Sequence, residues 1–137
     1  MKLLSQYFTI ARLISLRAPT GHWSKLHSRR FLLRKFSRPG VGYWHDTGHA
    51  QIKENLGFIS HALHLESLAG RLLGFHLHDV EFPGHDHRPP GRGMIDFAAL
   101  KPWVKREHIK VFELSPRLTE EEARQGVAHL KQLWGEE

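Results

Sequence analysis

Cysteine is absent from this 137-residue chain. Disulfides, thiolate metal sites and cysteine nucleophiles are therefore excluded. A chain without cysteine fits a reducing interior, so we expect a cytoplasmic protein. Long apolar runs are absent too, and since a spanning helix needs about 20 consecutive apolar residues, we expect no contact with a membrane interior.

Acidic residues are absent from the first 45 positions, and the first one is Asp46. Residues 1–39 hold nine Lys/Arg and carry +9, whereas residues 40–137 hold eleven Lys/Arg and fourteen Asp/Glu and carry −3. The overall charge of +6 thus belongs to one end of the chain, and by itself it does not indicate a nucleic-acid-binding surface. We expect a basic N-terminal segment at 1–39 and a folded region at 40–137.

The basic segment supports four hypotheses. Apolar positions in residues 1–17 are spaced as one helical stripe, which predicts a partly helical segment. The segment could be an arm that binds nucleic acid or an anionic membrane, or an organelle-targeting sequence, because such sequences are rich in Arg and Ser and poor in acids. It could equally be a poorly ordered terminus. The fourth hypothesis is a non-native start, such as an out-of-frame or truncated gene beginning.

From residue 41 onward the pattern alternates between strands and helices. Strands are predicted at 41–46, 72–77 and 109–114, and helices at 50–69, 97–104 and 120–134. Asp96 and Thr119 are the expected N-caps of the second and third helices, and Thr119 forms a capping-box signature with Glu122. Pro102 should kink or split the second helix. This alternation predicts an α/β fold with parallel strands.

Potential ligands are concentrated between Phe75 and Gly93. This stretch holds four histidines and three acids: His76, His78, Asp79, Glu81, His85, Asp86 and His87. Pro-Gly and Pro-Pro-Gly sequences within it predict an irregular loop. Chemistry commonly sits in loops held by a rigid scaffold, so we expect a metal or acid–base site here.

Each predicted strand ends on a candidate ligand: Asp46, His76 and Glu113. The carboxyl ends of parallel strands lie on one side of a sheet or barrel, where active sites form, so these three side chains can converge. One imidazole and two carboxylates suit Mn²⁺, Zn²⁺, Fe²⁺, Co²⁺ or Mg²⁺.

Four ordered motifs extend this pattern into a family resemblance. They are Asp46-Thr47-Gly48-His49, Phe75-His76-Leu77-His78-Asp79, the run from His87 to Phe97, and Phe112-Glu113. Together they resemble the closing half of the xylose isomerase-like TIM barrels, which include sugar phosphate isomerases/epimerases and type IV apurinic endonucleases. The resemblance covers roughly residues 41–134.

The resemblance implies roles for individual residues. Asp46, His76 and Glu113 would be ligands of a divalent metal such as Mn, Zn, Mg or Co, and Glu113 would also transfer a proton. His49 and His87 match positions that contact substrate in the isomerases or an additional metal in the endonucleases, and Arg88 is added as a candidate contact for a substrate phosphate. The implied reaction is isomerisation or epimerisation of a sugar or sugar phosphate through an enediolate.

Two departures from the family shape this expectation. The family supplies another glutamate ligand from strand five, and no acid precedes Asp46 here. His85 stands where the endonucleases place an aspartate ligand, which favours the isomerase branch. Because a complete barrel needs about 250 residues, we expect a partial (β/α)8 barrel of three C-terminal βα units, truncated at its N-terminal half.

Several alternatives stay open at this point. The chain could be a catalytically inactive fragment, a homo-oligomer or a half-barrel that needs a complementing partner; a nucleic-acid-binding or apurinic endonuclease-like role ranks below these. Asp46 and His49 could merely cap a helix, and His76 could be a satisfied core residue. The remaining histidines in predicted helices and turns are expected on the surface: His61, His64, His108 and His129.

Overall fold

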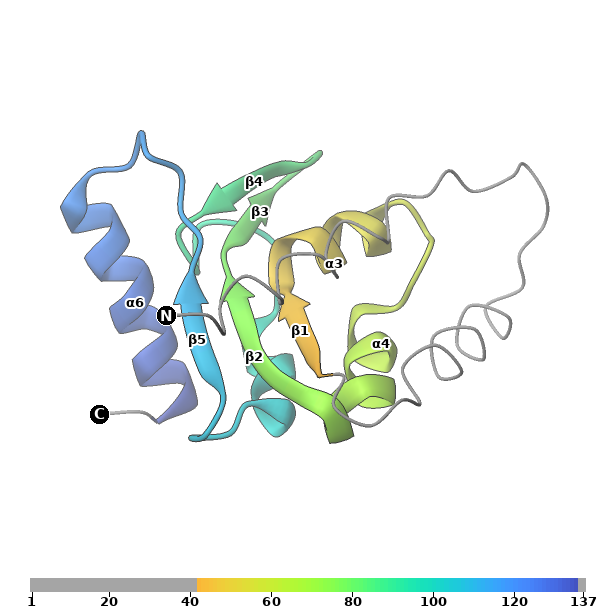
Figure 1. Ribbon diagram of the computed structural model, residues 1–137. Coiled ribbons are helices and arrows are strands. Elements are labelled where there is room, and N and C mark those ends of the chain that lie inside the picture. Colours follow the sequence, from red (N-terminus) through yellow and green to blue (C-terminus); the bar gives the residue numbers. More distant parts are fainter. Residues whose placement is uncertain (1–41, 136–137) are drawn as a thin grey trace, which may run out of the picture.

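The computed structural model describes residues 42–135. The predictions for residues 1–39 lie outside this range. Within it, three strands form a parallel sheet: β1 (Tyr43–Asp46), β2 (Leu72–Leu77) and β5 (Ile109–Phe112), in the order β1-β2-β5. The three arrows point toward the same end of the sheet, where the carboxyl ends of the strands lie (Figure 1). The predicted parallel α/β architecture is confirmed.

The connection from β1 to β2 differs from the prediction of one helix at 50–69. It contains α3 (Thr47–Asn55), α4 (His61–Leu68) and the short 3₁₀ helix η2 (Ala69–Arg71). Gly57 adopts a left-handed conformation, with φ 73°, and its backbone N–H bonds back to the carbonyl of Glu54. This glycine ends α3 in the way that a C-terminal cap does. The regular spacing of apolar residues continues across this break, which is why the sequence predicted a single helix.

The stretch expected to be irregular contains a small antiparallel pair. β3 (Asp79–Glu81) pairs with β4 (His85–Arg88), and Pro83-Gly84 lies in the turn between them. Pro and Gly therefore mark the turn of a hairpin here, and the prediction of a structureless loop was wrong. Figure 1 shows this pair beyond the end of β2, at the carboxyl ends of the parallel strands.

The C-terminal half follows the predicted pattern closely. α5 (Phe97–Leu100) is capped by Asp96, and the chain continues as the 3₁₀ helix η3 (Lys101–Trp103), so the helix changes type at Pro102 as expected. α6 (Glu120–Trp134) begins with the predicted capping box of Thr119 and Glu122.

One face of the sheet carries the hydrophobic core. Phe75 and Leu77 point from β2 into a cluster that α6 completes with Leu130 and Trp134. The indole N–H of Trp134 donates to the carbonyl of Phe97, which ties α6 to α5. Because side chains alternate along a strand, His76 and its neighbours on the other strands are left on the opposite face. The core thus fixes which side chains can form a site.

None of the helices described is both long and apolar enough to cross a membrane. The cytoplasmic location stays a prediction.

Candidate metal centre

The ends of the three parallel strands bring Asp46, His76 and Glu113 together. Asp46 is the last residue of β1 and lies beside His76 in the sheet register. Glu113 follows the last residue of β5, and its backbone N–H donates to the carbonyl of Leu77. One potential ligand atom from each of the three lies within 4.8 Å of the other two. The predicted convergence is present.

The distances within this cluster fit a shared cation. His76 Nδ1 lies 3.3 Å from Glu113 Oε2 and 3.7 Å from Asp46 Oδ2. Donor atoms that bind one ion at ~2.1 Å are about 3.0–3.4 Å apart in tetrahedral or octahedral geometry. Small side-chain movements would therefore suffice to close the three groups around a divalent metal.

The charges of the cluster also favour a cation. Within residues 42–135, Asp46 forms ion pairs with three histidines and Glu113 with two. Burial alone would raise the pKa of Asp46, but hydrogen bonds from His49, His76 and His78 outweigh it and hold that pKa far below its ordinary value. The hydrogen bond with Asp46, with a smaller contribution from the Glu113 charge, raises the pKa of His76. The two carboxylates thus favour a proton on His76, and a metal ion bound between them would satisfy the same negative charge.

Asp46 is also the N-cap of α3, so the helix-cap interpretation and the ligand interpretation both hold. Its Oδ1 accepts the backbone N–H of His49 at 2.8 Å. Its Oδ2 lies 2.8 Å from His49 Nδ1, and this contact raises the pKa of His49. One carboxylate oxygen caps the N-terminus of α3, while the other faces the cluster.

His49 and His87, the predicted substrate contacts, lie at the rim. Asp86 stands between them, with Oδ1 2.9 Å from His87 Nδ1 and Oδ2 3.8 Å from His49 Nε2. His87 Nε2 is 3.7 Å from Glu113 Oε1. His87 also has a positive φ of 57°, a costly conformation for a residue with a Cβ, and one that recurs at functional sites. Both histidines are partly exposed, so a ligand can reach them.

His78 is closer to the cluster than its place in the sequence suggested. Its ring is fully buried, with Nε2 3.1 Å from Asp46 Oδ1, and it stacks on His87 with ring centroids 4.4 Å apart. His78, His87 and Glu113 form a second group that could hold a metal by spacing alone. His76 and His78 are two residues apart, and such positions share a face in an extended chain. This spacing was the feature of the sequence that could have indicated that His78 lies near the cluster.

Asp79 holds the chain that follows the hairpin. Its buried carboxylate accepts backbone N–H groups from Val80, Gly91, Gly93 and Ile95, at 2.8–3.1 Å. Four such donors leave this carboxylate little capacity for a ligand, so its role is structural.

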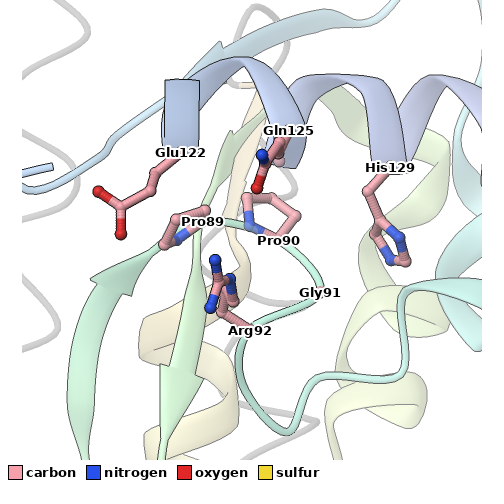
Figure 2. A pocket seen from close by; sticks show the side chains of 8 residues that line it. Pro89, Pro90, Gly91, Arg92, Glu122, Gln125 and His129 are labelled. Atoms are coloured by element: carbon pink, nitrogen blue, oxygen red, sulfur yellow. The ribbon is translucent and has the colours of Figure 1, made fainter. Parts of the chain in front are cut away.

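Arg88 does not lie with the cluster. Its guanidinium pairs with Glu81 across the hairpin at 3.0 Å, and no ion pair in the described part of the chain connects it to Asp46 or Glu113. A contact with a substrate phosphate would require Arg88 to leave this partner, and that role stays a prediction. A separate open pocket of about 210 Å³ lies between the Pro89–Arg92 segment and α6, where His129 and Glu122 flank it (Figure 2). None of the three clustered ligands lines that pocket.

Two histidines predicted on the surface are buried. His61 Nε2 lies 2.8 Å from His45 Nε2, and His45 Nδ1 lies 2.6 Å from the hydroxyl of Tyr43. His108 packs against Phe75. The expectation was wrong because a buried polar side chain is tolerated when it is hydrogen-bonded: His61 bonds to His45, and His108 Nδ1 accepts the backbone N–H of Lys105. His61 and His64 are spaced by three residues in α4, which places them on one helix face.

In a comparison with protein families, the family described as xylose isomerase-like TIM barrel matches residues 19–133. The matched region begins inside the basic segment and includes every residue of the cluster. Comparison with curated proteins and with solved structures finds no match.

Proposed function

The chain belongs to the xylose isomerase-like TIM barrel family, and from this we propose that it is a metal-dependent protein of the sugar or sugar phosphate isomerase/epimerase type. The observation that carries the proposal is the convergence of Asp46, His76 and Glu113 within 4.8 Å at the carboxyl ends of parallel strands. In TIM barrels, active sites form at the carboxyl ends of the strands.

The proposed metal ligands are Asp46 Oδ2, His76 Nδ1 and Glu113 Oε2. Their mixture of one nitrogen and two oxygen donors suits Mn²⁺, Zn²⁺, Co²⁺ or Mg²⁺. A divalent ion held there would stabilise negative charge that develops on substrate oxygens. Three protein ligands leave coordination positions for a substrate's carbonyl and hydroxyl oxygens.

Glu113 is the proposed proton-transferring residue. Its carboxylate removes the proton from the carbon next to the carbonyl; the C–H electron pair forms the C=C bond of an enediolate, and the carbonyl oxygen takes the negative charge. Return of the proton by Glu113 to the adjacent carbon on the same face, with the hydroxyl proton passing to the former carbonyl oxygen, gives the isomer; an epimer forms only when a second acid or water delivers a proton to the opposite face. Oε1 of Glu113 faces His87, on the opposite side of the carboxylate from the His76 contact, so one oxygen remains for the proton.

His49 and His87 are proposed to bind substrate hydroxyls. Each has a ring nitrogen within reach of Asp86 or Asp46, which orients the imidazole, and each is partly exposed. The substrate expected is therefore a small carbohydrate. Arg88 would be recruited only for a phosphorylated substrate, because its present partner is Glu81.

Titration calorimetry on the full chain tests the metal site. Mn²⁺, Co²⁺, Zn²⁺ and Mg²⁺ are titrated separately into the wild type and into Asp46→Asn, His76→Ala and His129→Asn variants. We expect one site that loses at least tenfold in affinity in the first two variants, because each removes a ligand or its charge. His129→Asn, on the exposed face of α6, should bind as the wild type does. Absence of metal binding, or equal affinity in all variants, would contradict the proposal.

Proton transfer is tested by incubating the metal-loaded chain with ketoses and aldoses, with and without a phosphate, in D₂O. We expect deuterium at the carbon next to the carbonyl, detected by NMR, and its loss in Glu113→Gln. Metal binding without any exchange would favour the alternative of a catalytically inactive fragment or a half-barrel that needs a partner.

A further inference from the structure

We propose that His78 is a positioning residue for Asp46: it holds one carboxylate oxygen and thereby directs the other toward the metal. This role rests on the proposed metal site of Asp46, His76 and Glu113. His78 would not itself be a ligand, although its spacing from His87 and Glu113 would allow it.

The hydrogen bonds of His78 determine which ring nitrogen carries the proton. The backbone N–H of His87 points at His78 Nδ1, with a nitrogen–nitrogen distance of 2.9 Å. A backbone N–H can only donate, so Nδ1 must be the acceptor and carries no hydrogen. In the neutral ring the hydrogen is then on Nε2, which lies 3.1 Å from Asp46 Oδ1 and donates to it. Both nitrogens are engaged, which leaves no lone pair for a metal.

Asp46 Oδ1 is saturated by this arrangement. It accepts from His78 Nε2 and from the backbone N–H of His49, at 3.1 and 2.8 Å. The carboxylate can rotate only by breaking both bonds. Oδ2 is therefore held on the side of the cluster, 2.8 Å from His49 Nδ1 and 3.7 Å from His76 Nδ1, its partner for a shared ion.

The residues around His78 hold its ring in one position. A Cβ on Gly48 would lie 2.0 Å from the His78 ring, so only glycine at the start of α3 permits this approach. The hydroxyl of Thr47 accepts the His78 backbone N–H at 3.1 Å and donates to its carbonyl at 2.8 Å. The ring is also stacked on His87 at an interplanar angle of 3°. His78 is thus held from three sides and connects the ligand Asp46 to the rim residue His87.

Two substitutions separate positioning from the other possible roles. In His78→Gln, the side-chain amide nitrogen takes about the place of Nε2 and can still donate to Asp46. In His78→Asn, the amide oxygen takes about the place of Nδ1 and can accept from His87, but the side chain is too short to reach Asp46. Both variants replace the imidazole with a neutral amide and differ by one methylene, so each is the control for the other.

The experiment is calorimetric titration of Co²⁺ and Zn²⁺ into the full chain, with the unfolding temperature of each metal-free variant recorded. We expect His78→Gln to bind within about threefold of the wild type and His78→Asn to bind about 10–100-fold more weakly, as for other outer partners of metal ligands. Equal affinity in the wild type and in His78→Asn would overturn the positioning role. Equal losses in both variants would overturn it too, because they would indicate a ligand or a space-filling ring.

Nitrogen-15 NMR of the metal-free wild type gives an independent reading of the ring. A hydrogen on Nε2 and none on Nδ1 supports the inference, whereas the opposite tautomer would overturn it even if metal binds. If the wild type binds no metal, the metal site fails and the proposed role falls with it; if the wild type binds and only the contrast between variants fails, the positioning role alone is wrong.

Discussion

Asp46 shows how one residue serves both the fold and the candidate site. Its Oδ1 caps the N-terminus of α3 by accepting the backbone N–H of His49, and its Oδ2 faces His76. A carboxylate at a helix N-terminus is stabilised by the unpaired N–H groups there, so capping keeps Asp46 charged. The charged form is the one that binds a metal.

The histidines behind β1 make a separate, uncharged group. His45 and His61 bond to each other, and burial is the main reason that the pKa of each is lowered. Burial, with smaller contributions from the charges of Lys53 and His61, lowers the pKa of His64 to about 4. Neutral imidazoles are required here because the site between α4 and β1 provides little solvent to stabilise a proton.

His64 therefore predicts an acid-sensitive contribution to stability. Between pH ~6.5 and ~4 the unfolded chain binds a proton at His64 and the folded chain does not. The contribution of His64 to stability therefore falls as the pH falls through this range, and it does not change further below pH ~4. Since one pKa unit corresponds to about 1.4 kcal/mol, the loss is roughly 2–3 kcal/mol after allowance for partial exposure. Urea unfolding at pH 7, 5.5 and 4.5 should give a shallower decline for His64→Gln than for the wild type.

Measurements above pH 7 provide the control for this prediction. Both His64 and its replacement are uncharged there, so the difference between the two proteins should not change with pH. Parallel declines between pH 6.5 and 4 would contradict a half-buried, neutral His64.

At the scale of elements, α6 illustrates a helix whose start is encoded locally. Thr119 accepts the backbone N–H of Glu122, and the Glu122 carboxylate accepts the backbone N–H of Thr119 at 2.9 Å. These two bonds satisfy donors that have no partner within the helix. No tertiary contact is needed for this boundary, and the sequence predicted it correctly.

We expect Thr119→Ala to lower the free energy of unfolding by about 1 kcal/mol, because the cap donors lose their acceptor. Arg124→Ala is the matched comparison on the same helix: it removes an exposed ion pair with Glu120, and such pairs contribute less than about 0.5 kcal/mol. Chemical denaturation of both variants measures the two effects, and an equal cost for both would show that the capping box does not stabilise α6.

The break between α3 and α4 illustrates the opposite case. Ile52, Leu56, Ile59 and Leu63 are spaced as one helical stripe, but Leu56 and Leu63 are 63% and 57% exposed. The glycine at position 57 ends α3, and α4 starts again in a direction that brings His61 onto His45. Periodicity cannot distinguish one helix from two when the second begins nearly in phase.

For the molecule as a whole, the sheet is covered on one face only by the described residues. The core lies on the face of Phe75 and Leu77. On the other face, Ile109 and Val111 of β5 are 58% and 41% exposed, and β5 pairs with β2 alone in the described sheet. An exposed apolar strand with an unpaired edge favours association with another chain.

We therefore expect the full chain to self-associate as its concentration rises, and Ile109→Lys to reduce this association by placing a charge on the strand. Leu63→Lys is the matched control, because it puts the same charge on a similarly exposed apolar residue of α4, away from β5. Sedimentation velocity over a range of concentrations measures the effect. A wild type that stays monomeric, or equal dispersal by both variants, would contradict a role for β5.

The family and the order of the three parallel strands followed from the sequence by itself. The alternation of these strands with helices and the caps at Asp96 and Thr119 depend on residues close in the chain, so local spacing was enough to predict them. The same argument predicted that Asp46, His76 and Glu113 converge, because parallel strands present their carboxyl ends together.

The tertiary structure alone decided the partners of the remaining polar groups. His78 reaches Asp46 from 32 residues away, His61 reaches His45 from 16 residues away, and Arg88 turns to Glu81 instead of the cluster. Such contacts depend on how helices and the hairpin are placed against the sheet, and residue spacing along the chain does not contain that information. The sequence thus determined which residues could carry chemistry, and the packing determined which of them meet.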